Sequence, residues 1–582
     1  MKKIFAIILL TASMMGCQSD LLDTFPYDTA ATENMWTTES LADQGVLGIY
    51  NALRYGTVAS EPYYFEGLGV GGNLAWNYGW NGLLTNQISG SDGFFWNYWV
   101  QHYEMISRAN DAITNLPKAP LTEEKMARLL SESKFFRAYA YYRLNAVYRG
   151  VPVYLEPTDV NEFTKGRETE EYVWKVVLDD LTDCINDVNL PGRYESNDTE
   201  YGRVTKGAAL ALRGKVYLWI KEYAKAEADF KAIAGLGYTL FQGGYGELFT
   251  EENERNPEII LSLQCLEEPG YGNLMSKWYG SRVAAGSCIN ELVPNTDFVE
   301  TYQWKDGKSF NWDDLFPGYS QMTPDQRLVY FLRDNLTEDE FARMESAGAD
   351  MSKYLPTGNE ARLLKAYMDR DPRLMATIIT PYSTFLGTDG LAAYIYTLRW
   401  PYRGYDASEP FDLRTNTNNF LYYLFRKFVG LGRDPYINRE NSPIDLPIIR
   451  YADVLLNLAE ALNEQGKTTE AITYVNMVRE RAGVAELNSN SETQVVGAED
   501  LRDRIRMERR WELNGEGITF YDELRWGVYK ESKFFEGSGL KQIYGKSSQY
   551  THAWNDRLLK WPIPNVEVER NSNLIQNPGW ES

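Results

Sequence analysis

Residues 447–483 read PIIRYADVLLNLAEALNEQGKTTEAITYVNMVRERAG, and this stretch decides the fold. Small or apolar residues recur at helical spacing up to a turn at Gly466, and again from that turn to Gly483. The two arms carry Ala452, Leu455, Leu456, Ala459 and Leu462, then Ala471, Ile472, Val475 and Val478. The pattern predicts two helices joined by a tight turn. Because one such hairpin cannot bury its apolar face alone, further helices must stack against it.

Other stretches repeat this pattern, and they lie towards both ends of the chain. The predicted helices cover residues 97–116, 131–148, 170–187, 206–220 and 223–234. Hairpins of about 34 residues with alanines at their contacts are typical of tetratricopeptide (TPR) units. Residues 241–440 are richer in glycine, proline and aromatics, and show little periodicity. We therefore expect a mainly α fold, with a TPR-like helical-repeat scaffold, a large loop-rich and aromatic-rich lobe, and few short strands.

The N-terminus has the pattern of an export signal. Two lysines precede an apolar core at residues 4–10, which is far shorter than the roughly 20 residues that span a bilayer. Cys17 follows in a position similar to the lipidation site of a bacterial lipoprotein, although Met14 stands where leucine is usual. Cleavage would then remove residues 1–16 and leave a lipid-anchored protein. Simple secretion with an unmodified Cys17 is the alternative.

Composition argues against several classes of function. The net charge of −22 disfavours nucleic-acid binding, which needs clustered lysine and arginine. Cys184, Cys265 and Cys288 form no CxxC pair, so we interpret them as buried small hydrophobic residues rather than metal or disulfide sites. His102 and His552 are the only histidines, and neither has a nucleophile motif nearby. No metal or cofactor is expected.

Several segments carry a resemblance to the SusD/RagB family of Bacteroidetes surface glycan-binding lipoproteins. Besides 447–483 they are SKFFRAYAYYRLNAVYRGVPVYL (133–155), TKGAALALRGKVYLWIKEYAKAEADFKAI (205–233), RIRMERRWELNGEGITFYDELRWG (504–527) and the tail motifs at 562–564 and 576–580. They occur in the family's order and, with the lipoprotein-like start, extend over nearly the whole chain.

The resemblance implies a function and a location. Such a protein binds glycan without covalent chemistry and acts as a lid on a SusC-like TonB-dependent outer-membrane transporter. Its lipid at Cys17 would anchor it in the outer membrane, and Asp20 and Asp23 resemble the acidic tag that directs such lipoproteins to the cell exterior. TPR surfaces generally bind partners, so we expect the transporter on the helical side.

The family pattern also suggests how the chain is divided. The expected regions are a signal peptide (1–16), an N-terminal SusD-like region (17–240), the midchain lobe (241–440) and a C-terminal region that completes the scaffold (441–582). Within the last region, Arg509, Glu512, Asp522 and Arg525 form a dense set of mixed charges. We interpret them as ion pairs that fix the C-terminal helix to the repeats, although charge clusters also occur at active sites.

Two kinds of motif resemble chemistry without the required context. Gly67–Gly72 fits GxGxxG, but no buried strand precedes it and no amphipathic helix follows, so nucleotide binding is disfavoured. A glycoside hydrolase would need two carboxylates across a sugar. Asp313 with Asp314, and Asp369 with Asp371, are the pairs to examine. Loop capping and a turn before a proline are the simpler interpretations.

Aromatic residues are the best ligand candidates, because a rigid ring with amides at its edge complements the flat C–H face of a sugar. They fall into two sets: Trp76, Tyr78, Trp80 and Trp96, then Trp278, Tyr279, Trp304 and Trp312. SusD-like proteins bind glycan on loops from these two zones. Packing in the core is the alternative, most of all for Trp96, which leads into a helix.

Three other functions stay open from sequence alone. The chain could serve as a peptide-binding lid of a transporter, as some relatives of this family do. It could be a surface glycoside hydrolase, if a carboxylate pair faced the aromatic residues. It could also be an assembly protein whose helical surfaces bind only other polypeptides. Stacking identifies sugar rings rather than linkages, so the sequence does not select one glycan.

Overall fold

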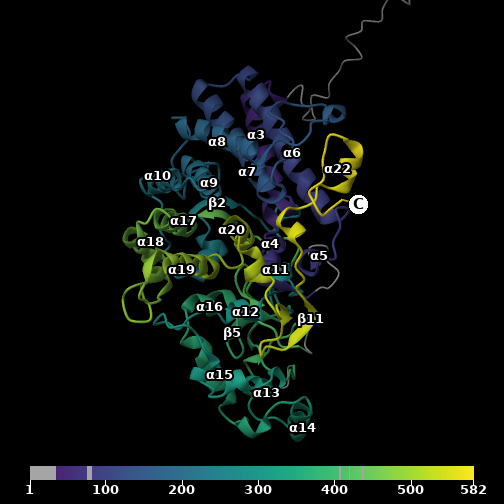
Figure 1. Ribbon diagram of the computed structural model, residues 1–582, viewed down its shortest axis with the longest axis vertical. Coiled ribbons are helices and arrows are strands. Elements are labelled where there is room, and N and C mark those ends of the chain that lie inside the picture. Colours follow the sequence, from purple (N-terminus) through teal and green to yellow (C-terminus); the bar gives the residue numbers. More distant parts are fainter. Residues whose placement is uncertain (1–34, 75–80, 405–407, 418–419, 435–437, 582) are drawn as a thin grey trace, which may run out of the picture.

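The computed structural model describes residues 35–74, 81–404, 408–417, 420–434 and 438–581. The body is elongated (Figure 1), with the N-terminal helices at one end and helices of the midchain at the other. The C-terminal part returns along one side, from β11 (Ser547–Thr551) to α22 (Asn565–Arg570). Among the described residues, no helix is both long and apolar enough to cross a membrane.

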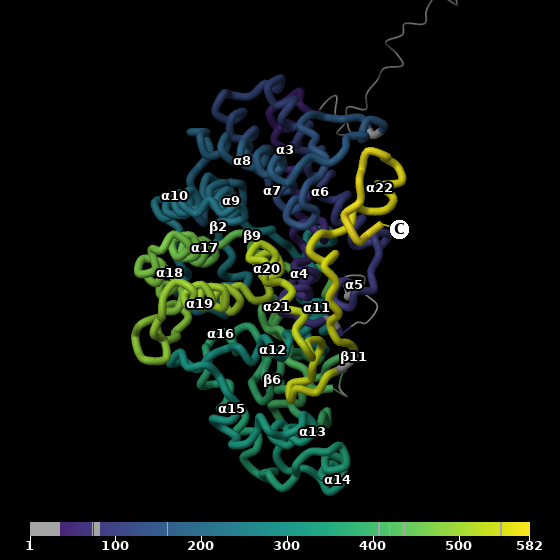
Figure 2. Tube along the Cα trace, viewed as in Figure 1, coloured from purple at the N-terminus to yellow at the C-terminus, as the bar shows by residue number. Residues whose placement is uncertain are grey.

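A continuous stack of helices forms the scaffold. Its members are α3 (Glu39–Asn51), α6 (Gly93–Asn115), α7 (Glu123–Tyr148), α8 (Glu170–Asn186), α9 (Lys206–Trp219), α10 (Tyr223–Ala234), α17 (Tyr451–Asn463), α18 (Thr468–Ala482), α19 (Gly497–Glu512) and α20 (Thr519–Trp526). From α6 to α10 each helix packs on the next, then α10 packs on α17, and α17 on both α18 and α19 (Figure 2). The predicted mainly α, TPR-like fold is confirmed.

Local signals explain where the helices begin and end. The turn at Gly466 and the end of α18 at Gly483 both have positive φ, +76° and +73°, which glycine adopts at little cost. The predicted helix at 131–148 begins earlier than expected, at Glu123. The reason is Thr122, whose hydroxyl accepts the backbone N–H of Lys125 (3.3 Å) and caps the helix.

Between α10 and α17 the chain forms short elements, and others flank the stack. The strands are β1 (Gly71–Asn73), β2 (Ile259–Leu263), β3 (Leu292–Pro294), β4 (Ile378–Ile379), β5 (Thr384–Thr388), β6 (Ala393–Thr397), β7 (Phe411–Asp412), β8 (Leu424–Phe425), β9 (Leu446–Arg450), β10 (Gly539–Lys541) and β11. The remaining α-helices are α4 (Tyr63–Leu68), α5 (Asn81–Thr85), α11 (Met275–Tyr279), α12 (Thr296–Val299), α13 (Pro324–Arg327), α14 (Glu338–Ser346), α15 (Asn359–Met368), α16 (Pro372–Thr377), α21 (Tyr529–Lys533) and α22. In the described residues the strands form two-stranded pairs and one three-stranded sheet, β5-β6-β7.

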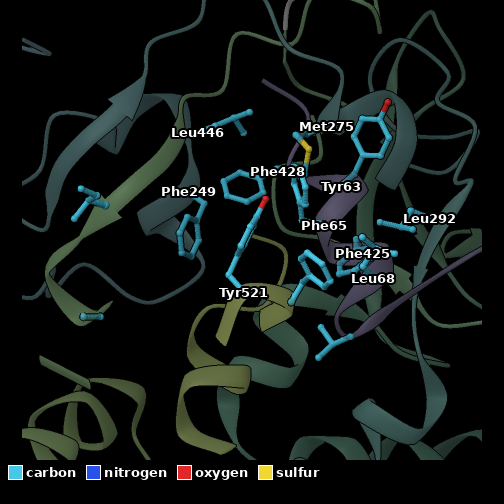
Figure 3. Packing of buried hydrophobic residues seen from close by; sticks show 14 of the residues in the cluster. Tyr63, Phe65, Leu68, Phe249, Met275, Leu292, Phe425, Phe428, Leu446 and Tyr521 are labelled. Atoms are coloured by element: carbon cyan, nitrogen blue, oxygen red, sulfur yellow. The ribbon is translucent and has the colours of Figure 1, made fainter. Parts of the chain in front are cut away.

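The antiparallel pair β2–β9 connects the midchain to the scaffold, because α17 begins directly after β9. Beside this pair, aromatic rings from distant segments meet in the core. Figure 3 shows Phe65 of α4, Phe249, Phe425 and Tyr521 of α20 in this cluster, and all four are buried. The same packing encloses the end of β9.

A carboxyl pair near β2 makes stability depend on pH. Glu254 Oε1 accepts the N–H of Asp445 (2.7 Å), and the Asp445 carboxylate accepts the N–H of Cys265 (2.7 Å). Burial raises the pKa of both carboxyls, and the Asp445 charge raises that of Glu254 further. A carboxyl whose pKa is higher in the folded state stabilises the fold only while protonated. We therefore expect the contribution of this pair to the free energy of unfolding to fall as pH rises from about 5 to 8.

The variant Glu254→Gln tests this expectation. It should flatten the pH dependence and stabilise the protein at pH 8 by on the order of 1 kcal/mol, because Glu254 is partly exposed to solvent. Urea unfolding followed by circular dichroism between pH 5 and 8 measures the change. An unaltered pH slope in the variant would contradict the assignment.

Ion pairs hold the C-terminal helices against the repeats, as the sequence predicted. Arg509 of α19 lies 2.8 Å from the Asp453 carboxylate of α17 and 2.8 Å from that of Asp522 in α20. Arg525 of α20 donates from Nη2 to Glu460 of α17 (2.7 Å). These side chains are almost completely buried. Because each carboxylate is paired with a guanidinium, the set fixes α17, α19 and α20 to one another.

A second group of buried charges surrounds the end of β9. Arg450 is 1% exposed and pairs with Glu258 (2.7 Å), Glu512 (2.7 Å) and Glu516 (2.9 Å). Burial acts to raise the pKa of Glu512, but the guanidiniums of Arg481 and Arg450 outweigh it and bring the pKa to about 2. Arg450 thus joins carboxylates from the midchain, from the end of α19 and from the segment after it.

The cysteines lie in the buried environments that the sequence predicted, and His102 is also buried. Cys184, Cys265 and Cys288 are free and buried. His102 is completely buried in α6, where Nδ1 lies 2.7 Å from the Tyr98 carbonyl oxygen, and burial lowers its pKa to about 3. A neutral histidine with an enclosed ring is a packing residue rather than a catalytic base.

Candidate functional site

Two short strands that flank the aromatic zones of the sequence pair with each other, and we call this pair the junction. Strand β1 pairs antiparallel with β3, and the register places Gly71 opposite Pro294. The next residue after β1, Leu74, donates its N–H to the Glu291 carbonyl (2.7 Å). The chain thus enters residues 75–80 beside residues 289–291. Trp76, Tyr78 and Trp80 lie outside the described residues, so their role stays a prediction.

The glycine-rich segment before this junction holds a lysine. The Lys533 ammonium donates to the carbonyl oxygens of Gly67 (3.1 Å), Gly69 (2.5 Å) and Gly71 (2.9 Å). Lys533 is buried, and its burial lowers the pKa to about 8, although the Glu523 charge acts in the opposite direction. The GxGxxG pattern therefore forms a carbonyl cradle for a cation, which fixes the start of β1.

Trp278 and Tyr279 of α11 belong to the interior. Trp278 is 8% exposed, and its ring centroid lies 5.2 Å from that of Tyr63. Tyr279 is fully buried, stacks on Phe425 at 4.0 Å, and donates its hydroxyl to the Gly515 carbonyl (3.2 Å). Rings covered in this way do not present a free face to a sugar. In this conformation their contribution is to packing, because neighbours from other segments enclose them.

The other predicted aromatics differ in exposure. Trp312 is 5% exposed, and its indole N–H donates to Glu300 (3.0 Å), so it is also a core residue. Trp304 and Trp96 are half-buried. The Arg570 guanidinium lies 5.5 Å from the Trp96 ring centroid, within cation–π range. These two keep part of their surface open, which makes them better ligand candidates than Trp312, Trp278 or Tyr279.

A polar cavity opens near the β1–β3 junction, with a volume of about 890 Å³. We call it the polar groove, and define it by Arg282, Ala284–Ser287, Thr388–Ala393, Arg414, Gly432 and Asp434. Its walls come from four parts of the midchain: the segment after α11, the β5–β6 turn, the segment around 414 and the segment around 432. Its volume is in the range of small-molecule sites.

Asn416 connects the groove to the junction. Its N–H donates to Asn290 Oδ1 (2.9 Å), and its side-chain amide donates to the Ile289 carbonyl (2.5 Å). The same side chain accepts a hydrogen bond from Arg282 Nε. The N–H of Arg282 in turn donates to the Arg414 carbonyl (3.0 Å). These bonds fix the side chain of Arg282 and the backbone of Arg414 at the rim of the groove, next to the segment that pairs with β1.

The groove also contains carboxylates. Asp389 accepts the backbone N–H groups of Leu391 (2.8 Å) and Ala392 (3.0 Å), which hold its pKa below the usual range. Asp434 accepts the Leu431 N–H, and burial raises its pKa. Guanidiniums, carboxylates and backbone amides together can bind the hydroxyl and acidic groups of a polar ligand.

Sequence reasoning did not find the groove residues. Arg282, Arg414 and Asn416 belong to no motif, and they are adjacent only because β5, β6 and the segment after α11 fold together. The available signal was composition: glycine-rich, polar stretches at 280–290 and 386–393 without helical periodicity. Such stretches indicate loops but not which of them meet.

The carboxylate pairs that the sequence singled out are structural. Asp313 accepts the Ser320 N–H (3.2 Å), and Asp371 caps α16 by accepting the Arg373 N–H (2.9 Å). The Arg373 guanidinium also pairs with Asp371 (2.7 Å). Both predictions, loop capping and a turn before Pro372, are confirmed. Within the described ranges, no three histidine, cysteine, aspartate or glutamate side chains form a group that could hold a metal ion.

Comparison with known proteins gives consistent matches. Residues 257–580 match the model of the SusD family, and residues 20–218 match a model described as starch-binding associating with outer membrane. SusD-like protein P25 of Formosa agariphila is 23% identical, over 99% of this chain and 98% of its own. The starch-binding protein SusD of Bacteroides thetaiotaomicron is 23% identical, over 79% and 74%.

A solved structure agrees with the observed fold. The crystal structure of a SusD-like protein from Bacteroides fragilis superposes with a TM-score of 0.73 at 24% identity, and covers 96% of this chain and 100% of its own.

Proposed function

This chain belongs to the SusD family, and from that membership we propose that it binds an oligosaccharide or polysaccharide at the outer membrane for nutrient uptake. The polar groove carries the proposal, since it combines fixed guanidinium, carboxylate and amide groups in a cavity of about 890 Å³. The junction beside it leads into residues 75–80, which hold three of the predicted aromatic residues. A sugar ring stacks its C–H face on an aromatic side chain and bonds its hydroxyls to polar groups at the edge of that side chain.

Two matches support a glycan as the ligand. The N-terminal part of the chain fits a family model described as starch-binding, and a relative over most of the chain is a starch-binding protein. We propose that the chain binds rather than cleaves its ligand. Asp389 and Asp434 line the groove but are held by backbone N–H groups of their own turns, which suits a binding role.

We further propose a SusC-like TonB-dependent transporter as the partner, with this chain as its lid. A lipid on Cys17 would hold the protein at the outer membrane, facing the exterior, and would raise its effective concentration near the transporter. Weak affinity for an individual sugar would then suffice. We place the transporter on the exposed side of the helical stack, because stacked helical repeats offer extended surfaces to partners.

Affinity electrophoresis tests the binding role. The soluble form that starts after Cys17 should migrate more slowly in gels that contain its polysaccharide, without new reducing ends in the same samples. Trp76→Ala and Trp80→Ala should each weaken binding by about 2- to 12-fold, the equivalent of about 0.5–1.5 kcal/mol for a lost stacking ring. Trp312→Phe, which alters a core ring, serves as the control and should bind normally if folded.

Each other outcome points to another function. New reducing ends that disappear in Asp434→Asn would identify a glycoside hydrolase. No retardation on any polysaccharide would contradict glycan binding, and would favour a peptide ligand or an assembly role.

A further inference from the structure

Three arginines gather on one side of the polar groove. Arg282 and Arg414 line the cavity, and their backbones are joined by a hydrogen bond (3.0 Å). Arg439 lies behind them and donates from Nη1 to the carbonyl oxygen of Ser287 (2.8 Å), another lining residue. Like charges repel in a cavity that excludes part of the solvent, so such a cluster is unfavourable unless a negative charge joins it.

The negative charge near this cluster comes from Glu291, whose charge acts on Arg282, and from Asp389 and Asp434 in the same cavity. Across the described segments, neither Arg282 nor Arg414 has a carboxylate oxygen within 4.0 Å. Arg282 uses Nε for Asn416, which leaves its two terminal nitrogens for a ligand. Burial lowers the pKa of Arg282, and the charges of Arg439 and Arg414 lower it further. Arg439 is 3.6 Å from Glu440, which already pairs with Lys277 (2.7 Å).

The chain as a whole is acidic, with a net charge of −22. Acidic residues exceed basic ones, and most buried arginines of the scaffold have carboxylate partners, as Arg450 and Arg509 do. A guanidinium presents a planar set of N–H donors that matches a carboxylate or sulfate group in a bidentate manner. Two of them at one rim, the Arg282 guanidinium held by Asn416 and the Arg414 guanidinium beside it, can receive such a group.

Resting on the glycan-binding function proposed above, we propose that the polar groove binds anionic sugar units, either uronic acids or sulfate esters, through the guanidiniums of Arg282 and Arg414. The groove also sets the orientation of the ligand. Asp389 and Asp434 line the cavity without pairing with these arginines, so they repel an anionic group and direct it to the arginine rim. Their carboxylates remain available to sugar hydroxyls.

Four immobilised polysaccharides test the assignment. Two are acidic, polygalacturonate and a sulfated galactan, and two are the corresponding neutral galactans that lack the carboxylate or sulfate groups. The soluble chain is compared with Arg282→Gln and Arg414→Gln at low and at high salt. Arg414 is exposed and its side chain makes no hydrogen bond or ion pair among the described residues, so its replacement leaves the fold intact. Arg343→Gln, at an exposed arginine on α14, is the matched control.

The expected result is preferential binding to one of the acidic polymers, and that polymer identifies carboxylate or sulfate as the anion. Arg414→Gln and Arg282→Gln should each weaken this binding about tenfold, since each loses a charge-assisted contact, while Arg343→Gln should not. Salt should weaken binding by the wild type more than binding by the Arg414 variant.

Equal binding of neutral and acidic polymers, or unchanged binding by both groove variants, would overturn the inference and leave glycan binding intact. If the chain bound none of these four polymers and no other polysaccharide, the proposed glycan-binding function itself would be wrong.

Discussion

The variant Arg450→Met is expected to lower the free energy of unfolding by about 3–5 kcal/mol, the cost of removing one partner from a buried ion pair. Arg450 pairs with Glu258, Glu512 and Glu516, and all three carboxylates are almost completely buried. Methionine fills much of the same volume, so the loss is one of charge rather than packing. The three carboxylates would remain buried and charged, with fewer cations to compensate them.

Urea unfolding followed by circular dichroism, together with the thermal midpoint, measures the effect. Arg343→Met is the control, because Arg343 is exposed on α14 and its replacement should change stability by less than about 0.5 kcal/mol. If Arg450→Met cost less than about 1 kcal/mol, then Arg481 and Arg373, which also pair with Glu512, would be sufficient to neutralise the group. The central role of Arg450 would then be wrong.

The second large effect is expected for Lys533→Met, which should cost about 3 kcal/mol. The ammonium of Lys533 is the hydrogen-bond donor to the carbonyls of Gly67, Gly69 and Gly71, and methionine offers none. Buried acceptors without a donor are unfavourable. Because these glycines lead into β1, whose pairing with β3 forms the junction, the variant should also bind the polysaccharide more weakly.

Lys530→Met is the matched control for this variant. Lys530 lies in the same helix, α21, but is exposed, so its loss should affect neither stability nor binding appreciably. Stability is measured by urea unfolding, and affinity under conditions in which the Lys533 variant is still folded. A destabilised variant with full affinity would show that the carbonyl cradle supports the fold without positioning the junction.

The helical scaffold was predictable because its signals are local. Helix periodicity, the turn and the helix end are all visible within a short window in residues 447–483 and 205–233. The predicted helix at 223–234 is found at those bounds. The C-terminal charges were interpreted correctly for a similar reason, since Arg509 and Asp522 are close in sequence and lie 2.8 Å apart. The predicted start of a helix was wrong where its capping residue lies well before the periodic part of the helix, as Thr122 does in α7.

The site was less predictable because it depends on contacts between distant segments. Trp278 and Trp312 have flanking residues typical of exposed loops, yet rings from elsewhere in the chain bury them. Conversely, Arg282 and Arg414 carry no local signal, and only the folded midchain brings them together. Composition indicated where ligand loops occur, whereas burial of each side chain depended on the tertiary structure.

The position of the midchain has a consequence for how such proteins diversify. Helices α10 and α17 are neighbours in the stack, yet the whole segment from 235 to 450 is inserted between them. Both ends of the insertion are fixed by the scaffold, and its buried residues pack and pair with the repeats, as Glu258 does with Arg450. The groove lies in this insertion, and its walls include exposed loops such as the β5–β6 turn. Exchange of those loops between relatives is thus a route by which new ligand preferences can evolve on an unchanged framework.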